Sequence, residues 1–220
     1  GDGVNDVLAL KCADCSVAMA SGSDAASNAA QIVLLDSDFS KMPEVVLEGR
    51  RVVNNIQTSA SLFLVKNIFS ILTTVFTLIA ANLYPLYPTQ LSLLGAFTIG
   101  TPAFVLALQP NKELIRGDFL VNVILKALPA GLADFIMLAA ISIHGNILGM
   151  SNEQISTVAI VILLFIGLAA LVRICRPFDG IRILLCLAMA AGIVICVLNF
   201  KGIFAIATVN MIMLRMIIMY

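Results

Sequence analysis

The sequence lacks tryptophan, has a single histidine and is poor in charged residues, which make up only 12% of its 220 positions. Soluble globular domains are about a quarter charged and about half apolar, whereas 60% of this chain is hydrophobic. This shortage of charge excludes an ordinary soluble domain and predicts an integral membrane protein. The formal net charge of zero gives no basic bias that would favour nucleic acid, and we expect no nucleic-acid partner.

The sequence also lacks an N-terminal signal peptide and an initiator methionine, since it opens on Gly1-Asp2-Gly3. We therefore expect the chain to be the C-terminal piece of a longer protein. Its five cysteines are not spaced as a disulfide framework, because three of them lie in or beside apolar stretches. Cys12 and Cys15 form a Cys-x-x-Cys motif, but without a second Cys/His pair we interpret it as coincidental rather than as a redox or metal pair.

Residues 1–40 have the pattern of a small α/β segment. Short helices are predicted over 8–13 and 24–30, and buried strands over 16–20 and 31–35. Strands separated by short helices favour a parallel sheet. A segment of this length cannot hold its own core, so we expect most of its domain to lie upstream of this chain.

One long helix is predicted over 41–81. Its first part, 41–59, is amphipathic, and the polar face disappears after Ala60. Pro43 falls in the first turn, where a missing N–H costs little, and no later proline interrupts the pattern. At about 1.5 Å per residue such a helix would be roughly 60 Å long, enough to stand in water and then cross a bilayer.

From residue 60 onward the chain predicts a bundle of apolar helices. Six stretches are long enough to span a membrane, at about 60–82, 90–109, 119–143, 155–172, 182–199 and 202–219. Positive charge marks the loops on one side, which hold Lys112, Arg116, Arg173, Arg176 and Arg182, whereas the other side holds only Lys201. Basic loops face the cytoplasm, so we expect both chain ends to be cytoplasmic.

The opening turn, Gly1 to Asp6, carries chemistry. The carboxylates of Asp2 and Asp6 and the amide of Asn5 supply the oxygen ligands that Mg²⁺ prefers. Gly1 and Gly3 let the backbone approach a phosphoryl group, and the helix that follows favours an anion at its N-terminus. By itself an acidic glycine turn is also typical of plain turns and of Ca²⁺ loops.

In its context, this turn resembles the hinge motif of P-type ATPases, the cation pumps that form an aspartyl-phosphate. Further matches follow in the same order, at 17–19, 22–26, 33–36, 48–50 and 54–56, and then come the predicted spans. The resemblance covers the whole chain. Residues 59–70 are similar to a bacterial branch that includes mycobacterial calcium-uptake pumps.

The resemblance implies a mostly α membrane protein in the bacterial plasma membrane. Residues 1–40 would end a haloacid-dehalogenase-like phosphorylation domain of α/β fold, residues 41–59 would be a stalk helix, and residues 60–220 would be a six-helix transmembrane domain. Asp2 would bind Mg²⁺, while Asn5 and Asp6, with Gly1 and Gly3, would help to bind the phosphoryl group. The phosphorylated Asp and the nucleotide-binding domain are absent from these residues, so ATP would be bound mainly by other parts of the protein. We expect the chain alone to be inactive.

The polar residues of the predicted spans make up the candidate transport site. The resemblance puts Asn67 and Thr98 at ligand positions, while Ser70 and Ile99 stand where calcium and sodium-potassium pumps carry carboxylates. From the residues themselves, an acid at mid-membrane depth is functional by default, or else it pairs with a base. The full set comprises Lys66, Asn67, Ser70, Thr98, Thr101 and Asp134.

Three functions remain open at this point. The first is an ATP-driven cation pump, with Ca²⁺ as the expected cation and membrane lipids and the missing N-terminal part of the protein as partners. The second is a lipid flippase or polyamine-type pump of the same superfamily, since those branches also lack the carboxylate pair. The third is a passive membrane subunit with an inactive phosphatase-like domain, which would have no reason to keep both Asp2 and Asp6.

Overall fold

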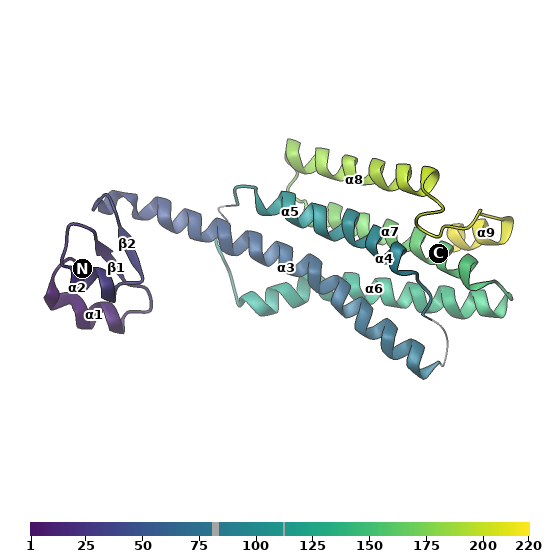
Figure 1. Cartoon of the computed structure of the whole chain (residues 1–220), viewed down its shortest axis with the longest axis horizontal. Helices are drawn as coiled ribbons and strands as arrows, with labels where there is room; N and C mark the ends of the chain where they lie inside the picture. The colour runs from purple at the N-terminus through teal and green to yellow at the C-terminus, as the bar shows by residue number, and fades with distance from the viewer. Residues whose placement is uncertain (81–83, 112) are drawn as a thin grey trace. The chain divides into compact units, whose positions relative to one another are not determined.

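The computed structural model describes residues 1–80, 84–111 and 113–220, which form two compact units, Gly1–Arg50 and Arg51–Tyr220 (Figure 1). Two details of the predictions, the outer end of the first span at 81–82 and the basic loop residue Lys112, lie outside the described residues.

The first unit contains the α/β pattern that the sequence predicts. After the short 3-10 helix η1 (Val4–Asp6) come α1 (Val7–Cys12), β1 (Val17–Met19), α2 (Asp24–Ala29) and β2 (Ile32–Leu34). The two strands are parallel, with Val17 opposite Ile32 and Met19 opposite Leu34. Leu10, Ala18 and Ala26 form a small buried cluster between the helices and the sheet.

α3 (Met42–Ile79) is the single unbroken helix that the sequence predicts (Figure 1). The 3-10 turn η2 (Phe39–Lys41) leads into it, and the side chain of Asp38 caps that turn by accepting a hydrogen bond of 2.9 Å from the backbone N–H of Ser40. With 38 residues, α3 is roughly 57 Å long. A Cβ added at Gly49 would meet no atom within 4 Å, so this glycine creates no close contact in the helix.

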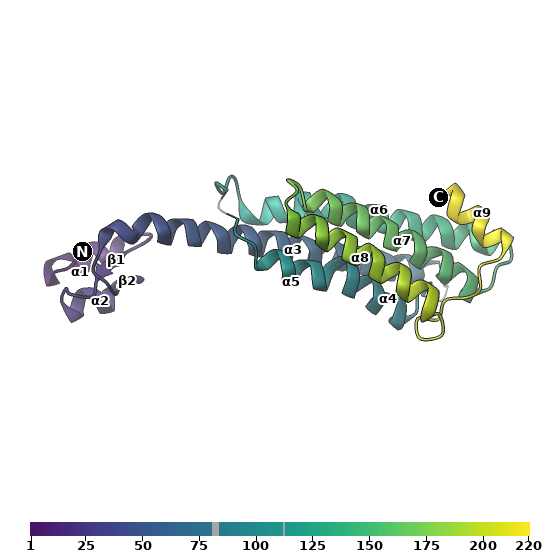
Figure 2. The ribbon, with the colours of Figure 1, turned by 90° about the horizontal axis from the view of Figure 1, so that it is seen from above.

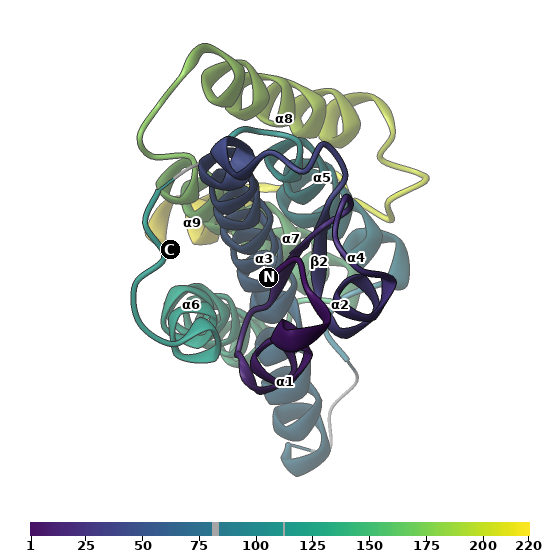
Figure 3. The same cartoon turned by 90° about the vertical axis from the view of Figure 1, so that its left-hand side faces the viewer.

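The second unit is a helix bundle built around α7 (Asn152–Ile174). It also contains most of α3, α4 (Pro88–Gly95), the π-helical segment η3 (Ala96–Gly100), α5 (Thr101–Ala107), α6 (Phe119–Ile147), α8 (Gly180–Asn199) and α9 (Met211–Met219). α7 lies between α6 and α8 (Figure 2), and these two lie on opposite sides of the bundle (Figure 3). Consistent with its central place, α7 has the longest run of fully buried residues, from Ile155 to Ile160.

Within residues 1–80, 84–111 and 113–220, five helical segments are long and apolar enough to cross a membrane. They are Phe39–Ile79, Pro88–Ala107, Phe119–Ile147, Asn152–Ile174 and Gly180–Asn199. The chain is therefore a mostly helical protein of multi-pass membrane type. These segments correspond to the first five predicted spans.

The last predicted span, 202–219, is corrected by the structure, because only nine of its residues form α9. Before α9 the backbone bonds to side chains of other helices: Gln90 donates to the oxygen of Ala205 at 3.0 Å, and the N–H of Ala207 donates to Thr157 at 2.9 Å. Asn210 then caps α9 by accepting from the N–H of Met213. These tertiary hydrogen bonds prevent a continuous helix, and a nine-residue helix of about 14 Å is shorter than the hydrocarbon core.

The C-terminal residue also lies elsewhere than expected. The hydroxyl of Tyr220 is 3.1 Å from Nδ1 of His144, in the last turn of α6. This is the end of the bundle where α6 ends and α7 begins. The prediction instead assigned the C-terminus to the opposite end, where α6 begins and Arg173 lies in the last turn of α7.

Candidate functional site

The opening turn is held in shape by the carboxylate of Asp6. Its Oδ2 accepts hydrogen bonds from the backbone N–H groups of Asp2, at 3.0 Å, and Gly3, at 3.3 Å. These two hydrogen bonds hold the pKa of Asp6 below its ordinary value, because they favour the charged carboxylate. Asp6 is thus engaged within the turn, which makes it a residue that positions Asp2.

A second contact fixes Asp2 from the other side. Its backbone oxygen accepts a hydrogen bond of 2.7 Å from the N–H of Ser23. A Cβ at Gly22 would lie 2.4 Å from that same oxygen, so only glycine allows the two segments to approach this closely. The match at 22–26 therefore has a structural reason: the glycine before α2 lets the backbone of Asp2 dock there.

The donor set of the turn fits a shared Mg²⁺ site. The carboxylate of Asp2 is exposed and, within the described ranges, has no hydrogen-bond or ion-pair partner, and Asn5 is exposed beside it. The described residues contain no group of three or more His, Cys, Asp or Glu side chains that could hold a metal ion alone. Mg²⁺ is commonly bound by one or two carboxylates together with waters and phosphate oxygens, which is what this turn can offer.

In the bundle, the structure brings three of the six predicted transport residues to one cavity. The cavity has a volume of about 30 Å³, room for about one water molecule. Lys66 of α3, Thr98 of η3 and Asp134 of α6 line it. Apolar residues from α4 and α7 complete the wall, so five elements, α3, α4, η3, α6 and α7, meet at this point.

Asp134 is the least satisfied group of this cavity. Its residue is only 5% exposed, and its Oδ1 has no hydrogen-bond partner among the described residues. Lys66 lines the same cavity with its ammonium directed at α4, where Nζ lies 3.8 Å from a Cβ built at Gly95. In the described part of the chain the two side chains form no salt bridge, and neither does Asp134 pair with Lys126.

Thr98 lies in a local break of regular α-helix. Its hydroxyl donates to the backbone oxygen of Leu94 at 2.7 Å, within the π-helical turn that precedes Pro102. Such π turns are frequent at functional sites. Sequence reasoning missed Gly167 of α7, which faces Thr98 so closely that a Cβ there would lie 2.6 Å from Cγ2 of Thr98.

The other predicted transport residues do not face this cavity. Asn67 and Thr101 are exposed, and Ser70 is half-buried. Thr101 begins α5 after the π turn, while Asn67 and Ser70 lie on α3. Their grouping with the cavity residues remains a prediction.

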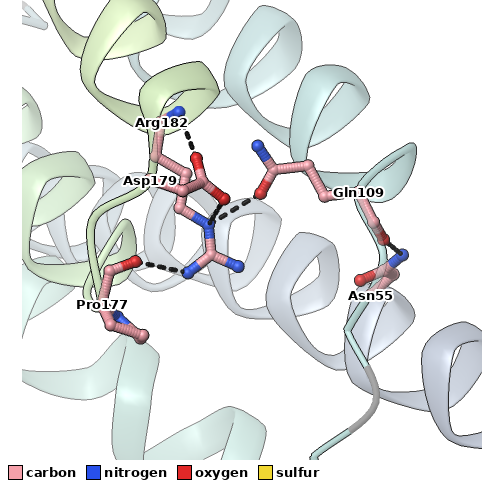
Figure 4. Close-up of polar contacts among 5 residues, drawn as sticks. All are labelled: Asn55, Gln109, Pro177, Asp179 and Arg182. Atoms are coloured by element: carbon pink, nitrogen blue, oxygen red, sulfur yellow. Dashed lines mark hydrogen bonds and ion pairs between the residues drawn. The ribbon is translucent and has the colours of Figure 1, made fainter.

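A buried polar network that the sequence did not single out joins α3, α5 and α8 (Figure 4). Asn55 is 7% exposed and donates from Nδ2 to the backbone oxygens of Ala107, at 2.9 Å, and Gln109, at 2.8 Å. Arg182 donates from Nε to Oε1 of Gln109 at 2.7 Å, and from its guanidinium to the oxygen of Pro177 at 2.9 Å. The last carbonyls of a helix need partners from outside, and Asn55 supplies them for α5.

Neighbouring residues of α3 extend this contact, and we call Asn54, Asn55 and Ser59 the α3–α5 clamp. Asn54 donates to the backbone oxygen of Glu113 at 3.0 Å. The hydroxyl of Ser59 donates to the backbone oxygen of Ala103 at 3.3 Å. The signal that could have revealed the clamp is the Asn54-Asn55 pair, two amides at the point where the helix turns apolar.

Comparison with known proteins gives the chain a family. No protein-family model matches it. It is 40% identical over 200 residues to the probable cation-transporting ATPase exp7 of Streptococcus pneumoniae. The matched residues cover 87% of this chain and 26% of that protein.

Two further relatives are named as calcium-transporting ATPases. The chain is 42% identical over 209 residues to CtpE of Mycobacterium bovis, covering 89% of this chain and 26% of that protein. It is 41% identical over 199 residues to CtpE of Mycolicibacterium smegmatis, covering 84% and 25%. The chain spans about a quarter of the length of these relatives. It therefore belongs to the family of P-type cation-transporting ATPases.

Proposed function

We propose that the whole protein is an ATP-driven P-type cation pump of the bacterial plasma membrane, with Ca²⁺ as its cation and the N-terminal unit of this chain in the cytoplasm. Residues 1–40 would complete its phosphorylation domain, 41–59 would be the stalk, and the helices that follow would form part of the membrane domain. The names of the relatives and the five apolar helices support this proposal.

At the phosphorylation side, Asp2 is the residue of this chain that would hold Mg²⁺. Its carboxylate is unpaired among the described residues, while Asp6, Ser23 and Gly22 fix the backbone on which it is carried. When bound, Mg²⁺ would offset the negative charge of a phosphoryl group during its transfer from ATP. The remaining ligands, including the phosphorylated Asp that the family implies, would come from the part of the protein outside this chain.

The observation that carries the transport proposal is the unpaired oxygen of Asp134. A buried acid without a partner in an apolar bundle is costly, and such residues mark ion pathways. Lys66 lies in the same cavity and would compensate the charge of Asp134 when no cation is bound. Asn67 and Ser70, which are not fully buried by the described residues, would face the part of the protein that this chain does not include.

The clamp would couple the two functions. α3 runs without a break from Met42 to Ile79 and carries the residues of the clamp. Asn55 ties α3 to the end of α5, the helix that directly follows the π turn with Thr98. Displacement of α3 would therefore move the wall of the cavity.

The test is ATP hydrolysis by the purified full-length protein, with a panel of divalent and monovalent cations, polyamines and lipids. We expect Ca²⁺ to stimulate hydrolysis, and we expect Asp134→Asn to raise the Ca²⁺ concentration for half-maximal stimulation about tenfold or more, since a bond to a charged group is worth about 1.5–3 kcal/mol. Asp118→Asn, at the exposed N-cap of α6, is the matched control. Stimulation by a lipid or polyamine instead of a cation would support the flippase or polyamine pump.

A further inference from the structure

A second, larger cavity opens at the end of the bundle where α6 begins and α7 ends. It has a volume of about 400 Å³. Lys126 of α6 and Arg173 and Arg176 at the end of α7 line it, with Asn122 of α6 and Thr58 and Ser61 of α3. We call these six residues and the space between them the basic pocket.

The basic pocket is strongly positive and lacks a counter-charge. Three cationic side chains line it and no acidic residue does. Within residues 1–80, 84–111 and 113–220, none of the three cationic side chains has a hydrogen-bond or ion-pair partner. Arg182, close by in sequence, is by contrast satisfied by Asp179, Gln109 and Pro177. Like charges gathered without a partner raise one another's energy, so an anion is the ligand that this pocket fits.

One wall of the basic pocket is apolar, which narrows the class of anion. Leu125 lines the pocket and is 64% exposed, and Pro129 continues the same wall. On the same stretch of α6, Leu120 and Val121 are also exposed. A free phosphate ion would leave this wall uncovered, whereas an amphiphile would cover both parts of the site.

The positions of the basic residues along α6 and α7 indicate how deep in the membrane the headgroup of such an amphiphile would lie. Lys126 is seven residues into α6, or about 10 Å from its start, and a lysine at this depth extends its ammonium toward the headgroup region. Arg173 lies in the last turn of α7, and Arg176 lies two residues beyond the end of that helix. Basic pockets between helices at the cytoplasmic side suit phospholipid headgroups.

We propose that the basic pocket binds the phosphate headgroup of an anionic phospholipid of the inner leaflet. The phosphate oxygens accept hydrogen bonds from Arg173 and Arg176, whose planar guanidinium groups match phosphate geometry, and Lys126 adds a third charge. The acyl chains lie along the exposed leucines of α6. The lipid would thereby bridge α6, α7 and the stretch of α3 that carries Thr58 and Ser61.

The experiment measures lipid preference of the full-length protein in phosphatidylcholine vesicles. Electron paramagnetic resonance with spin-labelled phosphatidylglycerol, and in parallel with spin-labelled phosphatidylcholine, gives the relative association constant. We expect a clear preference for phosphatidylglycerol, which falls about fivefold in each of Arg173→Gln and Arg176→Gln, the effect of one basic residue near a charged surface. Arg176→Lys retains the charge and should keep most of the preference.

Lys201→Gln is the matched control, since it removes one positive charge in the loop between α8 and α9, outside the pocket. An equal loss of preference in Lys201→Gln, or no loss in Arg173→Gln, Arg176→Gln and Lys126→Gln, would overturn the proposal.

A second measurement uses inorganic phosphate as a competitor, to distinguish a lipid headgroup from a soluble anion. If millimolar phosphate displaces the labelled lipid, the site is one for a soluble anion and the lipid proposal fails. Thermal unfolding of each variant identifies any that fails to fold, and the remaining variants then decide.

Discussion

Asn55, in the first half of α3, donates a hydrogen bond of 2.8 Å from Nδ2 to the backbone oxygen of Gln109, two residues beyond the end of α5. The same amide donates to the oxygen of Ala107, so both of its hydrogens are used. The contact joins segments that are more than fifty residues apart in sequence. It makes the end of α5 dependent on the position of α3.

The first prediction concerns this amide. Asn55→Asp keeps the shape but replaces two donors by carboxylate oxygens that face two backbone oxygens, so it should be more damaging than Asn55→Ala. Asn55→Ala leaves the buried oxygen of Gln109 and the part-buried oxygen of Ala107 without this donor, which should cost about 1–3 kcal/mol of stability. Thermal unfolding of the full-length protein measures this effect. A control is Gln57→Ala, because Gln57 is also buried on α3 but its side chain is not part of the clamp. An Asn55→Asp variant as stable as the wild type would contradict the prediction.

The second prediction concerns Arg182. Its planar guanidinium group makes two hydrogen bonds that a single lysine ammonium cannot make at the same time. Arg182→Lys should lose the bond from Nε to Gln109, at 2.7 Å, or the bond to Pro177, at 2.9 Å. Gln109 is 4% exposed and its Nε2 already lacks a partner among the described residues, so no water-exposed alternative is at hand. We expect a loss of about 1.5–3 kcal/mol, as for bonds to charged groups. Arg116→Lys, at an exposed position, should leave the melting temperature unchanged.

Some elements of the fold are determined by the local sequence, and others depend on residues far away in the chain. The helices and strands of the first unit, α3 and the first five spans follow from periodicity, and the structure places them within a few residues of their predicted bounds. The break before α9 could not be predicted, because it depends on Gln90 and Thr157, which reach the backbone of 205–207 from elsewhere in the chain. Apolar content alone favoured a helix there.

The candidate site divides in the same way. Asp2 and Asp6 follow from a short motif, yet their different environments do not: Asp6 is bonded within the turn, and Asp2 is free among the described residues. Asp134 and Lys66 belong to the predicted polar set of the spans, and the structure adds that the buried Asp134 and the exposed Lys66 line one cavity. Asn55 and Gly167 were missed because their importance comes from partners distant in sequence.

The third prediction separates the two acids of the opening turn. Asp2→Asn should abolish ATP turnover by the full-length protein while leaving its melting temperature unchanged, because the carboxylate of Asp2 makes no contact in the described part of the chain. Asp6→Asn should disturb the turn itself, since a neutral amide oxygen accepts the two backbone N–H bonds more weakly. Wild-type turnover in Asp2→Asn would remove Asp2 from the Mg²⁺ site.

A pH effect follows as the fourth prediction. The backbone hydrogen bonds from Asp2 and Gly3 lower the pKa of Asp6, so the folded turn binds this proton less readily than the unfolded chain does. The stabilisation is therefore complete above the ordinary pKa of an aspartate and is lost as the pH falls through the lowered pKa. Amide chemical shifts of Asp2 and Gly3, followed from neutral to acidic pH, should report this transition. In Asp6→Asn the transition should be absent. A transition at or above the ordinary pKa would contradict the assignment.

The last prediction uses two glycines with opposite surroundings. A Cβ at Gly167 would lie 2.6 Å from Cγ2 of Thr98, so Gly167→Ala must push α7 away from the π turn, at a cost of about 1–3 kcal/mol. A Cβ at Gly49 would meet nothing within 4 Å, so Gly49→Ala should stabilise α3 by about 0.5–1 kcal/mol, the difference between the two residues in a helix interior. Thermal unfolding of both variants should give opposite shifts in melting temperature if the packing is as described.

Gly167→Ala should also weaken cation stimulation of ATP hydrolysis, because Thr98 lines the same cavity as Asp134. Gly49→Ala should preserve it, and a Gly167→Ala variant with normal stability and normal cation stimulation would show that α7 does not pack against the π turn in the working protein.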